Sequence, residues 1–105
     1  MTNKEIENLF EEIFLEDDYV ETSRLHFPEF HTDEMEVLHV MLFGGMNGCG
    51  EWIEYLDDVM HVLKMCRKNK IYGYIVNWDI DALDDVFRVE IELRDLEEFN
   101  EEKPE

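Results

Sequence analysis

The sequence predicts an α+β domain, in which a roughly four-stranded, mainly antiparallel sheet carries two helices on one face. The order is helix, strand, strand, helix, strand, strand (αββαββ). Three observations support it: two segments have apolar residues at helical spacing, four have strand-like runs, and residues 44–50 form a Gly-rich connection. A chain of 105 residues fits a single domain. We assign that domain to residues 1–98 and a frayed acidic tail to residues 99–105.

Two helices are predicted by apolar stripes. Thr2 and Glu5 have the spacing of a capping box, in which each side chain bonds a free backbone N–H. Behind them a helix is expected to about residue 14, with one apolar face formed by Ile6, Leu9, Phe10, Ile13 and Phe14. The second helix is expected over residues 51–68, with a buried face of Trp52, Leu56, Val59, Leu63 and Cys66. Its C-terminal cations complement the helix dipole, which explains them without a nucleic-acid role: Lys64, Arg67, Lys68 and Lys70.

Four strands are expected, over residues 19–27, 35–43, 71–78 and 86–94. Pro28 ends the first, and residues 28–34 are interpreted as a connection. Residues 35–43 are almost continuously apolar, which is typical of a central strand covered on both faces or covered on one face and in contact with a protein on the other. In residues 86–94, one face is expected to be buried and one solvated, because Phe87, Val89, Ile91 and Leu93 alternate with Arg88, Glu90, Glu92 and Arg94.

The most unusual property of the chain is its charge. It has 28 Asp and Glu against 9 Lys and Arg, for a formal net charge of −19. Aromatic residues make up 12% of the chain, which distinguishes it from a disordered acidic tail. Such a charge repels nucleic acid, phosphorylated substrates and anionic membranes, and it attracts cationic protein surfaces. We therefore expect neither direct nucleic-acid binding nor membrane association.

Cysteine usage and the N-terminal sequence predict a cytoplasmic protein. The two cysteines, Cys49 and Cys66, do not form a disulfide framework, and no signal peptide or membrane span is visible. The cytoplasm would be that of a host cell if a phage encodes the protein. Cys66 falls on an apolar helical face and is expected in the core, whereas Cys49 lies in the Gly-rich stretch.

Catalytic and metal motifs are weak, so no enzyme activity, cofactor, catalytic residue or metal ligand is assigned. The stretch 79–85 begins like a calcium loop at Asp79 and Asp81, but Leu83 and Asp84 stand where a ligand and a glycine are needed. Zinc spacing is also missing, because the histidines are scattered along the chain: His26, His31, His39 and His61. Cys49 before a helix is the one candidate nucleophile, and no base can be assigned to it.

Clusters of acids are the candidate partner-binding residues. Carboxylates on alternate strand positions, or three to four apart on a helix, repeat at about 5–7 Å, a spacing that can imitate nucleic-acid phosphates. The assigned residues are Glu16, Asp17, Asp18, Asp57, Asp58, Asp79, Asp81, Asp84, Asp85, Glu90 and Glu92. Apolar anchors beside them are expected at Tyr19, Met46 or Trp78.

In size, charge and expected compartment the chain resembles phage anti-CRISPR and anti-restriction proteins, a resemblance of composition without a shared motif. It implies an acidic DNA mimic that blocks the basic nucleic-acid-binding surface of another protein, such as a nuclease. Three alternatives remain open at this point. They are an immunity or antitoxin protein that neutralises a basic nuclease toxin, a small metal-binding or cysteine-dependent enzyme, and an assembly protein that forms a homodimer through strand 35–43.

Overall fold

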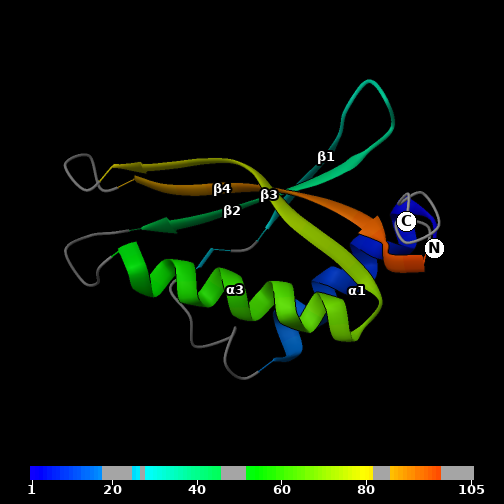
Figure 1. The fold of residues 1–105 in the computed structure, drawn as a ribbon, viewed down its shortest axis with the longest axis horizontal. Coiled ribbons are helices and arrows are strands. Elements are labelled where there is room, and N and C mark those ends of the chain that lie inside the picture. The colour runs from blue at the N-terminus through cyan, green and yellow to red at the C-terminus, as the bar shows by residue number, and fades with distance from the viewer. Residues whose placement is uncertain (18–24, 27, 46–51, 82–85, 98–105) are drawn as a thin grey trace, which may run out of the picture.

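The described residues form one antiparallel sheet with two long helices. The computed structural model describes residues 1–17, 25–26, 28–45, 52–81 and 86–97. The strands adopt the order β1-β2-β4-β3, and both helices lie on the same side of the sheet (Figure 1). The predicted fold class and order of elements are confirmed. The elements are α1 (Asn3–Glu16), β1 (Glu29–Thr32), β2 (Leu38–Gly45), α3 (Trp52–Lys68), β3 (Ile71–Asp81) and β4 (Val86–Asp95).

Helix α1 begins at the predicted capping box. The Thr2 hydroxyl oxygen accepts a hydrogen bond from the Glu5 backbone N–H at 3.2 Å, and Glu5 Oε1 accepts one from the Thr2 backbone N–H at 3.1 Å. The helix continues to Glu16, two residues beyond the predicted end. The apolar stripe faces the sheet, and its buried members are Ile6, Phe10, Ile13 and Phe14.

We predict that Thr2→Ala lowers the free energy of unfolding by about 1 kcal/mol, because the substitution removes one half of the capping box. Chemical denaturation monitored by circular dichroism measures this change. Asn8→Ala is the matched control, since Asn8 is exposed in the same helix and makes no cap. Equal stability of the two variants would show that the cap contributes nothing to α1.

The first strand among the described residues is β1, which lies in the segment interpreted as a connection. Most of the strand predicted over residues 19–27 lies outside the described residues. Of that earlier segment the structure describes Leu25, which forms an isolated bridge to Gly44, and His26, whose backbone N–H bonds the Phe43 carbonyl at 2.8 Å. A long-range contact explains the position of β1, because its Phe30 packs edge-on against Phe10 of α1 with ring centroids 5.6 Å apart.

Strand β2 is central, as predicted, and one of its faces is covered by the helices. Leu38, Val40 and Leu42 belong to the core on the helix side, whereas His39 and Met41 are half-buried on the opposite side. One edge of β2 pairs with β4 along Leu38–Gly45, and the other pairs with β1 over residues 38–41. The homodimer suggested by the sequence stays a prediction, and edge-to-edge pairing at residues 38–41 would require the displacement of β1.

Helix α3 covers the sheet with a face close to the predicted one. Val59 and Cys66 are buried as expected, together with Tyr55 and Val62, while Leu56 and Leu63 are partly buried against the core. The side chain of Trp52 lies outside the described residues. At the end of the helix, Lys70 adopts a left-handed backbone with φ of 64°, and the chain turns directly into β3.

Strands β3 and β4 complete the sheet. The predicted alternation in β4 is confirmed on its buried side, where the core contains Phe87, Val89, Ile91 and Leu93. Strand β3 extends past its predicted end to Asp81, with a register shift between Ile75 and Asn77. The acidic tail at 99–105 lies outside the described residues. Across the described part of the chain, neither helix combines the length and apolarity needed to cross a membrane.

Candidate functional site

The structure separates the predicted contact acids into two main groups. Asp79, Glu90 and Glu92 lie on the face of the sheet that is opposite the helices, which we call the open face. A second group belongs to the helical side: Glu16, Asp17, Asp57 and Asp58. Asp81 ends β3, and its side chain is outside the described residues, as are Asp18, Asp84 and Asp85. The described acids thus do not form one continuous surface.

Two of the three predicted contact acids on the open face are paired with arginines. Asp79 Oδ2 lies 3.5 Å from Arg88 Nη2, and Glu92 Oε1 lies 3.3 Å from Arg94 Nη2. Glu92 is only 8% exposed, and it is flanked in the sheet by His39 of β2 and Tyr74 of β3. The alternate acids of β4 therefore do not present a row of free charges, which the strand spacing had suggested.

The acids of the helical side are brought together by contact between α1 and α3. Asp17 follows the last residue of α1, and its Oδ1 lies 2.9 Å from His61 Nε2 on α3. Asp57 and Asp58 precede His61 by about one helical turn, so they lie near this junction. Asp57 is exposed, but Asp58 is 6% exposed and is therefore removed from the predicted contact surface by its burial.

A groove of about 270 Å³ runs between α1 and α3. Its apolar lining comes from Leu9, Ile13 and Met65, which are buried or half-buried. Its polar lining comes from Glu12, Glu16, Asp17 and Asn69, of which both glutamates are exposed. An apolar floor with an anionic rim matches the chemistry of a Lys or Arg side chain, which has an aliphatic stem and a cationic head. We call this feature the acidic groove.

Cations lie beside the acidic groove. Lys64, Arg67 and Lys68 line a shallow pocket of about 350 Å³ toward the C-terminal end of α3, and Met65 borders both hollows. These side chains occupy the last turns of the helix, where positive charge is stabilised by the dipole, as the sequence analysis concluded. The groove therefore has cations next to it on α3, whereas Glu12 and Glu16 of α1 contribute its acidic lining.

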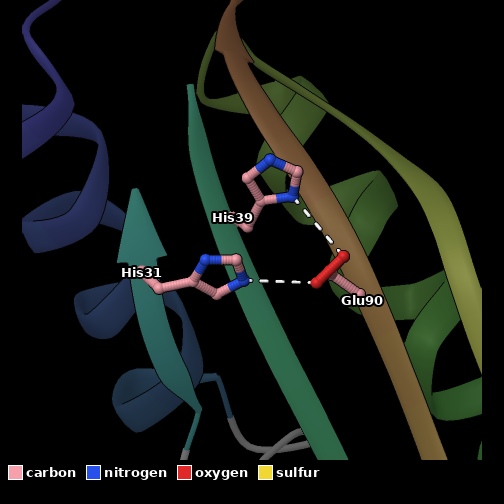
Figure 2. Close-up of side chains that lie close together, drawn as sticks. All are labelled: His31, His39 and Glu90. Carbon is pink, nitrogen blue, oxygen red and sulfur yellow. Dashed lines mark hydrogen bonds and ion pairs between the residues drawn. The ribbon is translucent and has the colours of Figure 1, made fainter. Parts of the chain in front are cut away.

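On the open face, two histidines lie beside Glu90, and the three residues come from three different strands. His31 of β1 lies directly opposite His39 of β2, and Glu90 of β4 reaches both (Figure 2). His31 Nε2 is 3.2 Å from Glu90 Oε2, and His39 Nδ1 is 3.8 Å from Glu90 Oε1. These histidines are scattered along the sequence, so no metal site was predicted from them. His31 and His39 lie four residues before and four residues after Met35, so a hairpin that turns near Met35 places them opposite each other. This signal was missed because residues 28–34 were interpreted as a connection.

Asp33, in the turn between β1 and β2, orients His39. Its Oδ1 accepts hydrogen bonds from the backbone N–H groups of Met35 and Val37 at 2.8 and 3.0 Å, which fixes the carboxylate. Its Oδ2 lies 3.0 Å from His39 Nε2. The hydrogen bond with His39, followed by those from the backbone, holds the pKa of Asp33 below its usual value. A carboxylate oxygen accepts hydrogen bonds, so Asp33 can accept the N–H of His39 Nε2.

Cys66 is not available as a nucleophile. It is fully buried in the core, as predicted, and burial raises the pKa of its thiol to about 12. The thiolate that nucleophilic attack and metal binding require is therefore strongly disfavoured at neutral pH. Cys49, the other sequence candidate, lies outside the described residues.

The fold and the groove together define an α+β protein with an anionic hollow on its helical side. No protein-family description, curated protein or solved structure matches this chain.

Proposed function

We propose that the protein is an acidic inhibitor of the DNA-mimic type, which binds and blocks the basic nucleic-acid-binding surface of another protein. Phage anti-CRISPR and anti-restriction proteins are the class of inhibitor meant. The observation that carries the proposal is the acidic groove, since it combines an anionic rim with an apolar floor. The net charge of −19 adds long-range attraction for a cationic surface.

The mechanism is competitive. Lys or Arg side chains that normally hold phosphates enter the acidic groove, where their stems pack on Leu9, Ile13 and Met65 and their heads meet Glu12 and Glu16. A partner side chain held in this way is not free to bind a phosphate. Charge attraction speeds the encounter, and burial of apolar surface at the contact slows dissociation.

Exposed apolar side chains are available as anchors for such a contact. Leu15 is 59% exposed on α1, next to Glu16 and one turn from Glu12. Trp78, an anchor suggested by the sequence, is 66% exposed on β3 and does not line the acidic groove. Large aromatic residues at the centre of an interface commonly contribute much of its binding energy. The other two suggested anchors, Tyr19 and Met46, lie outside the described residues.

We predict that the double substitution Glu12→Lys and Glu16→Lys slows association with the partner by at least about tenfold at low ionic strength, because the rim of the groove becomes cationic. The partner is the protein captured on immobilised wild-type chain from a lysate of the cells that carry the gene. Association rates are measured by stopped-flow or surface-binding methods over a series of salt concentrations. The difference between variant and wild type should shrink as salt rises.

Two controls separate the groove from general charge. Glu29→Lys with Glu34→Lys makes the same change in charge at two exposed residues that do not line the groove, and it should slow association less. Lys68→Glu, next to the groove residue Asn69, should speed association. If the two double variants slow binding equally, the groove is not the contact. Unchanged rates in both would rule out electrostatic recognition altogether.

A further inference from the structure

The two histidines and Glu90 have the separations of ligands around one metal ion. One ligand atom from each residue lies within 4.8 Å of the other two, and ring nitrogens of His31 and His39 lie 3.2 and 3.8 Å from the Glu90 oxygens. A tetrahedral zinc ion, bound at about 2.0–2.1 Å, holds its ligand atoms about 3.3 Å apart. The imidazole rings are stacked, with centroids 4.9 Å apart and planes 10° from parallel, so that both present an edge to the same carboxylate (Figure 2).

A metal ion between His39 and Glu90 would satisfy a ring nitrogen that makes no hydrogen bond. Asp33 Oδ2 lies 3.0 Å from His39 Nε2 and can accept its N–H, and in that tautomer Nδ1 offers a lone pair to the ion. That Nδ1 atom is buried without a hydrogen-bond partner, and it faces the Glu90 carboxylate at 3.8 Å. This distance exceeds that of a hydrogen bond. An ion bound between Nδ1 and the Glu90 carboxylate would be a ligand partner for both atoms.

The chemistry of these donors selects the kind of ion. Imidazole nitrogen and carboxylate oxygen together suit zinc and its first-row neighbours, whereas calcium and magnesium prefer sites made entirely of oxygen. A carboxylate that accepts the second ring N–H of a ligating histidine is also a regular feature of zinc sites, and Asp33 occupies that place. We propose that His31 Nε2, His39 Nδ1 and Glu90 bind a divalent transition-metal ion, with zinc as the best match.

A metal ion at this site would link three strands of the sheet. It joins β1, a four-residue strand at the edge of the sheet, to β2 and β4. Three protein ligands leave a fourth position on the open face, where His31 is exposed, for water or a further ligand. The site lies across the sheet from the acidic groove, so it does not depend on the inhibitor proposal.

Calorimetric titration of chelator-treated protein with ZnCl₂ tests this proposal. We expect saturable binding of one zinc per chain, a higher melting temperature with zinc than with EDTA, and no comparable effect of CaCl₂. His31→Asn and Glu90→Gln should each raise the Kd for zinc at least about tenfold. Asp33→Asn should raise it about 10–100-fold, because the amide can donate to Nε2 and thereby shift the ring proton to Nδ1.

His26→Asn is the matched control, since His26 is exposed and lies outside the cluster, and it should bind zinc as wild type does. The visible absorption of bound Co²⁺ gives a second readout, which wild type and His26→Asn should share and which His31→Asn and Glu90→Gln should lose. The proposal is overturned if wild type does not bind zinc saturably. It is equally overturned if His31→Asn and Glu90→Gln both bind zinc as tightly as wild type, since the ion would then be held by other acids.

Discussion

Phe10→Ala is expected to lower the free energy of unfolding by about 3–5 kcal/mol, because it opens a cavity where α1 meets the sheet. Phe10 is fully buried, stacks on Phe14 with centroids 6.4 Å apart, and meets the Phe30 ring edge-on. A domain of this size is stable by only about 5–15 kcal/mol in total, so the variant should lose a large fraction of its stability. Urea denaturation, followed by tryptophan fluorescence and circular dichroism, measures the change.

Leu15→Ala provides the comparison in the same helix. Leu15 is mostly exposed, so its truncation should change stability by no more than about 0.5 kcal/mol. A loss of less than about 1 kcal/mol for Phe10→Ala would contradict the packing of α1 against β1.

Gly44→Ala is expected to destabilise the protein by about 1–3 kcal/mol through overpacking. A Cβ atom at Gly44 would lie 2.5 and 2.6 Å from Cδ1 and Cε1 of Tyr55. The Tyr55 ring is fully buried and packs on Phe87 with centroids 5.0 Å apart, so it has no free space into which to move. The same denaturation experiment measures this effect.

Gly73→Ala is the matched control on the same side of the sheet. Its added Cβ would lie 3.0 Å from Leu63 Cδ2 and 3.1 Å from Leu93 Cδ2, which are the ends of aliphatic side chains that can shift by a few tenths of an ångström. Its loss of stability should therefore be the smaller of the two. A larger loss for Gly73→Ala would mean that the contact between α3 and the end of β2 is looser than the structure shows.

Periodic patterns were sufficient to predict the architecture of this protein. The stripe of α1 and the alternation of β4 each repeat over several residues, and burial follows the repeat in both. Strand β1 has only four residues, and its place depends on the contact between Phe30 and Phe10, which are far apart in the sequence. A pattern within the strand itself cannot contain that information.

The candidate sites were harder to predict because both depend on contacts between elements. Glu12 and Glu16 form a groove only because α1 packs beside Met65 of α3. His31 and His39 meet only through the register of a hairpin, and Glu90 joins them from a strand about 50 residues further along the chain. The total negative charge was plain in the sequence, but its pairing with Arg88 and Arg94 on the open face was not.

Competition with DNA tests the inhibitor proposal most directly. The partner captured by this protein is incubated with labelled duplex DNA, and DNA binding is followed while unlabelled wild-type chain is added. If the chain occupies the basic surface of its partner, DNA is released in proportion to the complex formed, and the Glu12→Lys, Glu16→Lys variant releases much less. Formation of a ternary complex, in which partner, DNA and this protein are bound together with undiminished affinity, would contradict the account.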